Sequence, residues 1–143
     1  MNKNLNSKKM PVRKFLNPFL LIMLPLILLS CEKEPGEGGK ATLYGKVFVK
    51  EYNASFTVLQ EEYYGPDIWV YIIYGDNRDY NDRIRTSYDG TWEFKYLRPG
   101  DYIVYTYSKD STLQTNAPVP VIRKVTISSN KEETEVPEFI IFN

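Results

Sequence analysis

The feature that most limits the fold is the residue pattern from Ala41 to the end of the chain. Apolar and aromatic side chains alternate there with polar ones over short runs, which are bounded by Gly, Pro, Asp and Asn. A period of two places successive side chains on opposite faces of a strand, and no run has the spacing of an amphipathic helix. The pattern therefore predicts an all-β fold.

Seven runs are predicted to be strands, and an eighth segment at 54–62 is either a strand or an ordered loop. The seven lie at residues 41–50, 67–74, 83–88, 91–97, 101–108, 119–128 and 134–142. Short strands at this spacing favour an antiparallel β-sandwich over a parallel sheet covered by helices. Asp89-Gly90 and Pro99-Gly100 separate consecutive runs, and both pairs are typical of tight hairpin turns.

Alternation also predicts which side chains face the core. Trp92, Phe94 and Tyr96 share one parity and are expected to point inward. In 68–74 and 101–107 both parities are apolar or aromatic, whereas a strand with one hydrated face alternates with polar residues. The second face of these strands must therefore be covered or bind something.

Four aromatic residues on that second face form the candidate binding face. They are Trp69, Tyr71, Tyr105 and Tyr107. Aromatic rings stack on sugars, and exposed apolar patches mark binding sites. Three explanations stay open at this point: the long aromatic segment 50–66 covers the face, a partner or a second copy binds it, or a carbohydrate binds it.

Residues 1–30 have the layout of an export signal. Residues 1–14 carry five basic side chains and no acidic one, and residues 15–30 carry no charge. This apolar stretch is interrupted by Pro18 and Pro25 and is shorter than the roughly 20 residues that span a bilayer. The layout predicts a cleaved signal peptide rather than a retained transmembrane helix.

The residues Leu28-Leu29-Ser30-Cys31 resemble the lipobox of bacterial lipoproteins. The resemblance implies cleavage before Cys31, the only Cys of the chain, and attachment of lipid to its thiol. Partnership with a membrane through this lipid follows, and we expect the outer membrane of a Gram-negative bacterium, on its periplasmic or its surface side. Residues 31–40 contain three glycines and are predicted to be a flexible tether.

Composition excludes several classes of function. Without residues 1–30 the chain keeps thirteen basic and eighteen acidic side chains, a formal charge of −5, which argues against nucleic acid as a partner. The chain has no His, so Ser-His-Asp and Cys-His catalysis and His-ligated zinc are excluded. No phosphate loop or nucleophile elbow is present, so we expect neither an enzyme nor a cofactor.

One loop is a weak candidate for calcium. Asp76, Asp79 and Asp82 lie in the segment DNRDYNDR, and hard cations prefer several oxygen ligands from one loop. The spacing matches no EF-hand, and Arg78 and Arg83 offset the charge. A hydrated loop without metal is therefore the favoured interpretation.

Four segments of residues 41–142 carry a family resemblance. They are Leu43-Tyr44-Gly45-Lys46-Val47, Ile68-Trp69-Val70-Tyr71-Ile72, Thr86-Ser87-Tyr88-Asp89-Gly90-Thr91-Trp92-Glu93-Phe94 and Leu97-Arg98-Pro99-Gly100-Asp101-Tyr102-Ile103-Val104. In this order they resemble the carboxypeptidase regulatory-like domains. The resemblance implies a seven-stranded, prealbumin-like β-sandwich for residues 41–143, related to Cna-B-type repeats, and an accessory role without catalysis.

The sequence thus predicts a lipid-anchored envelope protein with one β-sandwich domain for binding, adhesion or scaffolding. Its partner is an envelope protein or a glycan. The alternative is a carbohydrate-binding accessory lipoprotein of a glycan-uptake system. The two differ in the ligand of the candidate binding face.

Overall fold

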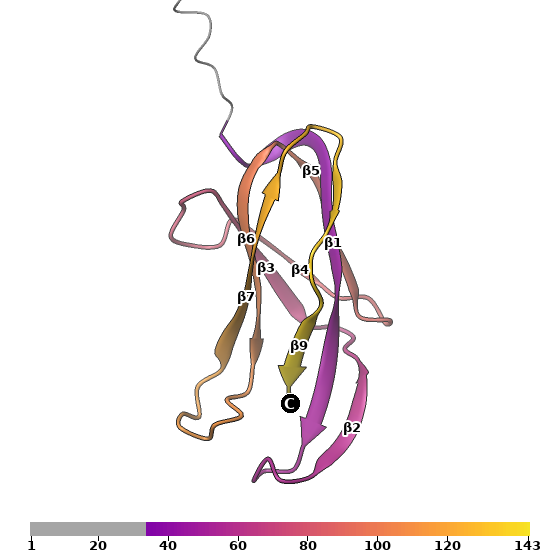
Figure 1. Ribbon diagram of the computed structural model, residues 1–143, viewed down its shortest axis with the longest axis vertical. Coiled ribbons are helices and arrows are strands. Elements are labelled where there is room, and N and C mark those ends of the chain that lie inside the picture. The colour runs from indigo at the N-terminus through magenta and orange to yellow at the C-terminus, as the bar shows by residue number, and fades with distance from the viewer. Residues whose placement is uncertain (1–33) are drawn as a thin grey trace, which may run out of the picture. The chain divides into compact units, whose positions relative to one another are not determined.

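The structure is a computed structural model that describes residues 34–143. These residues form nine strands and no helix (Figure 1). The strands are β1 (Glu37–Tyr52), β2 (Leu59–Tyr64), β3 (Trp69–Tyr74), β4 (Asp82–Arg85), β5 (Thr91–Leu97), β6 (Gly100–Ser108), β7 (Val119–Ile127), β8 (Glu133–Glu135) and β9 (Phe139–Phe142). The all-β prediction is confirmed, and the strand count is nine rather than seven in the described part of the chain.

Strand β1 organises a sheet of five strands. Strands β5 and β2 pair antiparallel with its first and second halves, while β8 and β9 pair parallel with it. Val47, an odd-numbered residue of β1, forms backbone hydrogen bonds with Gly90 and Gly65. Tyr44 and Lys50, which are even-numbered, form theirs with the C-terminal segment. Successive residues of a strand bond to opposite edges, so β5 and β2 share one edge and β8 and β9 the other.

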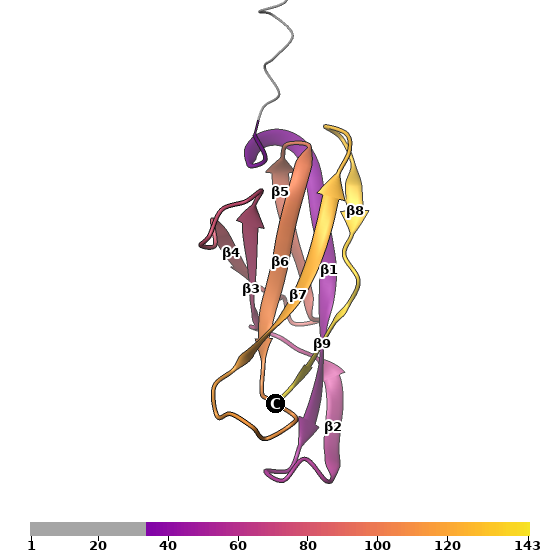
Figure 2. The same cartoon turned by 60° about the vertical axis from the view of Figure 1, so that its left-hand side comes forward.

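The second sheet has four strands in the order β4-β3-β6-β7, all antiparallel. Figure 2 shows β6 and β7 running alongside β1, and the hairpin of β1 and β2 at the end opposite the first described residues. The predicted wholly antiparallel arrangement is wrong for β8 and β9. Parallel pairing needs a long connection between the two strands. The chain between β1 and β8 is long enough, because after β5 it crosses to the second sheet to form β6 and β7 before it returns to the first sheet.

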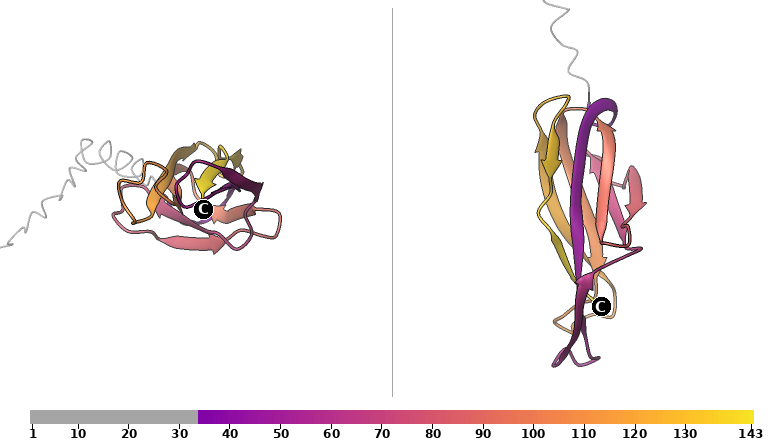
Figure 3. Two further views of the ribbon diagram at one scale, coloured as in Figure 1. Left: turned by 90° about the horizontal axis from the view of Figure 1, so that it is seen from below. Right: turned by 90° about the vertical axis from the view of Figure 1, so that its right-hand side faces the viewer.

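One hydrophobic core lies between the two sheets, consistent with the predicted two-layer architecture. Both sheets contribute fully buried side chains, among them Leu43 and Phe139 from the first and Ile72 and Tyr102 from the second. The view along the domain in Figure 3 shows strands surrounding this core. Odd-numbered residues of β1 point into it, because Ala41, Leu43, Val47 and Val49 are buried while their neighbours are not.

The predicted inward set in β5 is right for two residues and wrong for one. Trp92 and Phe94 are buried, but Tyr96 is 69% exposed and has a positive φ of 61°. The pairing of β1 with β5 shifts register opposite this point, and Leu97 is buried in place of Tyr96. A β-bulge inserts one residue and reverses the parity beyond it.

The two predicted hairpins are crossovers between sheets. Asp89-Gly90 joins β4 to β5 and Pro99-Gly100 joins β5 to β6, and in each case the two strands belong to different sheets. Both glycines have positive φ, 74° at Gly90 and 143° at Gly100, so the turns form where expected. Their flanking strands pair elsewhere: β5 with β1, and β4 and β6 with β3.

The fold begins earlier than the predicted domain boundary. Strand β1 starts at Glu37, inside the predicted tether 31–40, and Gly36 already bonds to the turn between β5 and β6. Strand β2 begins at Leu59, inside the segment predicted as 54–62, and extends beyond it to Tyr64. The prealbumin-like topology stays a prediction.

Candidate binding face

The structure brings the four predicted aromatic residues together on the outer surface of the four-stranded sheet. Trp69 and Tyr71 lie on β3, and Tyr105 and Tyr107 lie on β6. Tyr71 pairs with Tyr105 in the register of these strands, which places their side chains side by side. The alternate residues of both strands, Val70, Ile72, Val104 and Thr106, are buried in the core.

The tyrosine rings contact one another. The rings of Tyr71 and Tyr105 are stacked, with centroids 5.0 Å apart and an interplanar angle of 12°. Tyr107 meets Tyr71 and Tyr105 edge to face, each at 5.7 Å. Offset-stacked and edge-to-face pairs are the favoured aromatic geometries, so the rings hold one another in place.

A fifth ring, that of Tyr80, comes from the loop between β3 and β4. It meets Tyr71 edge to face at 5.2 Å and is 47% exposed. Sequence reasoning missed it because the loop is polar and has no strand period that would assign Tyr80 to a face. We call Trp69, Tyr71, Tyr80, Tyr105 and Tyr107 together the aromatic face.

Two arginines of β4 lie over Trp69. The guanidinium carbon of Arg83 is 4.3 Å from the centre of the indole ring, and that of Arg85 is 4.4 Å away. Register explains the contact, because Arg85 pairs with Trp69 and Arg83 with Tyr71 across β3 and β4. The Trp69 ring is therefore occupied by cations and is not a free platform for a sugar, which changes the predicted role of this residue.

The segment 50–66 does not cover the aromatic face. Its first residues continue β1, and β2 pairs antiparallel with β1 in the other sheet. The salt bridge between Lys50 and Glu62, with 3.0 Å between Nζ and Oε1, joins these two strands. The covering explanation is therefore wrong, because the length of β1 gives β2 a partner on the opposite sheet.

The outer face is partly exposed within the described part of the chain, since Trp69, Tyr71 and Tyr105 are half-buried while Tyr80 and Tyr107 are exposed. Tyr107 is 43% exposed, and Ile122, which pairs with Tyr105 from β7, is 48% exposed. Burial raises the pKa of the Tyr105 hydroxyl, and the neighbouring Tyr107 adds to the shift. The Tyr105 hydroxyl therefore stays neutral at physiological pH. A phenol hydroxyl can both donate and accept hydrogen bonds.

The weak calcium candidate does not assemble. In the loop between β3 and β4 the Asn81 carboxamide oxygen accepts bonds from the backbone N–H of Tyr74, at 2.8 Å, and from the Asn77 side chain. The Asp82 carboxylate accepts a bond from the backbone N–H of Arg83. Among residues 34–143 no three acidic, Cys or His side chains are grouped as metal ligands, so Asp76, Asp79 and Asp82 form no such site.

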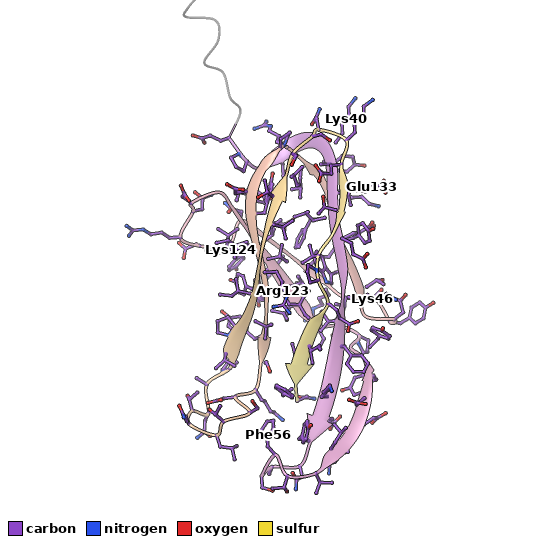
Figure 4. All side chains as sticks on the ribbon, viewed as in Figure 1. Lys40, Lys46, Phe56, Arg123, Lys124 and Glu133 are labelled. Atoms are coloured by element: carbon purple, nitrogen blue, oxygen red, sulfur yellow. The ribbon has the colours of Figure 1, made fainter. Side chains whose placement is uncertain are left out.

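A recess at the far end of the domain is a weaker candidate. It has a volume of about 480 Å³ between the loops 53–58 and 109–118, and Figure 4 shows its residue Phe56 at the end opposite Lys40. Its polar groups serve the loops themselves: Asn53 Oδ1 accepts bonds from the backbone N–H of Thr57 and Val58. These bonds occupy the Asn53 carboxamide oxygen, which is therefore not available to a ligand.

Cys31, the predicted lipid site, and the predicted signal peptide 1–30 lie outside the described residues. In the part of the chain that is described, no helix has the length and apolar character needed to cross a membrane.

Comparison with solved structures finds matches to this chain. No family model and no curated protein matches the chain. A crystal structure from Pseudomonas aeruginosa, named as a candidate carbohydrate binding protein, superimposes with a TM-score of 0.46 and 12% identity. The match covers 76% of this chain and 91% of the other.

Proposed function

We propose that the protein is a lipid-anchored, non-catalytic binding module of the cell envelope, and that its ligand binds the aromatic face. One observation carries the proposal. Four tyrosine rings contact one another on the outside of the four-stranded sheet, and Trp69 joins them through Arg83, which lies beside both Trp69 and Tyr80. Strand β2 pairs with β1 in the other sheet and does not cover them. Exposed apolar patches of this kind mark interaction surfaces on soluble domains.

The lipid anchor is supported by the sequence at Cys31 and is compatible with the start of the fold. Backbone atoms of Gly36 bond to Arg98 at 2.8 Å and to the Tyr102 hydroxyl at 3.0 Å. Lipid on Cys31 would therefore be separated from the folded domain by a few residues only. A chain spans at most about 3.5 Å per residue, so the domain would stay close to the membrane.

The anchor is tested by metabolic labelling with a clickable palmitate analogue. The intact protein is expected to take up the label, and the Cys31→Ser variant is expected to lose it while it is still made. Equal labelling of both proteins would contradict the anchor. Protease treatment of intact cells then separates a surface location from a periplasmic one.

The aromatic face is tested first by stability. Tyr105→Ala removes an outer ring, and Val104→Ala is the matched change at the next residue, which is fully buried. We expect Val104→Ala to lower the free energy of unfolding by about 2 kcal/mol or more, and Tyr105→Ala by about 1 kcal/mol, the size of a surface ring contact. A larger loss for Tyr105→Ala than for Val104→Ala would show that its ring belongs to a core.

One observation favours carbohydrate as the ligand, as in an accessory lipoprotein of a glycan-uptake system. The face combines ring edges with phenol hydroxyls that can donate and accept hydrogen bonds, and sugars present apolar faces beside hydroxyl groups. A glycan array probed with the intact protein tests this alternative. Binding that disappears in Tyr105→Ala supports it, and binding that survives in Tyr105→Ala assigns the glycan to another surface.

A further inference from the structure

We infer that Arg83 is the anion-binding residue of the aromatic face, and that the ligand is an acidic oligosaccharide that carries carboxylate or sulfate groups. The inference rests on the proposed function, since it concerns the same face. It adds the charge of the ligand and the residue that recognises this charge.

Arg83 lies beside two aromatic rings. Its guanidinium carbon lies 4.3 Å from the Trp69 ring centre and 5.9 Å from that of Tyr80. Tyr80 in turn contacts Tyr71, which stacks on Tyr105. A long flexible side chain is thereby positioned before any ligand binds, which lowers the entropy cost of binding.

The charge of Arg83 is not neutralised inside the domain. Among the described residues no carboxylate lies within salt-bridge distance of Arg83, whereas Arg85 beside it is bonded to the Asp67 carboxylate. Asp82 is next in sequence, but it pairs with Ile72, a core residue, and so has the parity of the opposite face. Arg83 is therefore the cation of the pair that is available to a ligand.

The hydrogen-bonding edge of a guanidinium group is the part that recognises an anion. A guanidinium that lies over a ring uses its flat face, while its N–H groups point outward in the plane of the group. These N–H groups match two oxygens of a carboxylate or sulfate in a bidentate pair. Lys124 on β7, across the sheet, adds a second exposed positive charge beside β6 (Figure 4).

An oligosaccharide fits these groups better than a compact anion does. The rings of Tyr71, Tyr105 and Tyr107 continue from Arg83 across β3 and β6, so a ligand anchored at Arg83 would pass over three phenol groups. Sugar units can contact the rings while an acidic group meets the guanidinium. The formal charge of −5 for residues 31–143 makes this cationic site a local exception.

The experiment compares ligands that differ only in charge. Isothermal titration of the intact protein uses oligogalacturonate and its fully methyl-esterified form, with sulfated chondroitin oligosaccharide as a second acidic probe. The variants are Arg83→Gln, Arg83→Lys and, as a control of equal charge change, Arg78→Gln in the neighbouring loop.

We expect an acidic probe to bind, the neutral ester to bind at least about tenfold more weakly, and Arg83→Gln to lose about tenfold or more in affinity. Arg83→Lys should recover only part of the loss because an ammonium group cannot form the bidentate pair. Arg78→Gln should bind like the unchanged protein, and added salt should weaken binding.

Three results would overturn the inference. They are equal binding of the acid and its ester, full affinity of Arg83→Gln, and no binding of either acidic probe. The first two leave the proposed function standing if Tyr105→Ala still abolishes binding. If the unchanged protein binds no carbohydrate in this test or on the glycan array, carbohydrate is not the ligand of the aromatic face.

Discussion

The hydroxyl of Tyr102 joins the start of the fold to the turn between β5 and β6. It accepts a hydrogen bond of 3.0 Å from the backbone N–H of Gly36 and donates one of 2.7 Å to the carbonyl oxygen of Arg98. The Arg98 N–H also donates to the carbonyl oxygen of Gly36, at 2.8 Å. Part of the predicted tether is thereby held in the domain.

Tyr102→Phe should lower the free energy of unfolding by about 1–3 kcal/mol, because it leaves buried backbone groups without their partner. Urea unfolding measures the loss, and amide hydrogen exchange at Gly36 should become faster. Tyr96→Phe, at an exposed ring, is the control and should stay within about 0.5 kcal/mol of the unchanged protein. Equal stability of the two variants would mean that the Tyr102 bonds do not hold the segment.

Gly45→Ala should destabilise the domain because Trp92 occupies the space of the new methyl group. A Cβ atom at this position would lie 2.8 Å from Cζ2 of Trp92 and 3.1 Å from the carbonyl oxygen of Val136. Overpacking of this kind costs about 1–3 kcal/mol. Lys46→Ala, at the exposed next residue, is the matched control, and unfolding followed by tryptophan fluorescence would refute the clash if both variants lost equally little.

The hydroxyl of Tyr74 should make the domain sensitive to alkaline pH. Burial raises the pKa of Tyr74 to about 12, and the Glu37 and Asp82 carboxylates add to the shift. Because the pKa is higher in the folded state, the neutral Tyr74 hydroxyl contributes its full share to the free energy of unfolding below pH 10. This contribution is lost as the pH rises towards 12. Tyr74→Phe should therefore lose less stability over this range than the unchanged protein, as measured by urea unfolding at each pH. A parallel decline of both would contradict the assignment.

The carboxyl group of Asp89 should titrate far below its usual range. Hydrogen bonds from the Ser87 hydroxyl, the Thr91 hydroxyl and the Thr91 backbone N–H lower its pKa to about 2. A lowered pKa stabilises the turn above the ordinary pKa of 3.8, and this contribution is lost as the pH falls towards 2. Carboxyl carbon shifts in NMR locate the midpoint, and Ser87→Ala should move it upward. A midpoint near 3.8 in the unchanged protein would show that these bonds do not persist in solution.

Local pattern predicted the strands well because period two depends on neighbouring residues alone. It placed Trp92 and Phe94 in the core and Tyr71 and Tyr105 outside it. It misplaced Tyr96 because the bulge beside it belongs to two strands together, β1 and β5. It also could not assign β8 and β9 to β1, since the choice between distant partners depends on the whole core.

The candidate face was recognised in the sequence by strands with two apolar sides, and this signal identified four of its five rings. Tyr80 and Arg83 could not be assigned in that way. Their positions depend on the course of the loop after β3 and on the register of β4. In the sequence, Arg83 is interpreted only as a positive charge that offsets the nearby aspartates. The sheet to which segment 50–66 belongs likewise could not be predicted, because it depends on the length of β1, which extends to Tyr52.

The most direct test of the central claim is a co-sedimentation titration with envelope fragments from cells that make the protein. The Cys31→Ser chain, which separates ligand binding from lipid attachment, is compared with the same chain carrying Tyr71→Ala and Tyr105→Ala. We predict saturable sedimentation of the first protein and none of the second, with both folded. Equal sedimentation of the two proteins, or no sedimentation of the first, would contradict binding through the aromatic face.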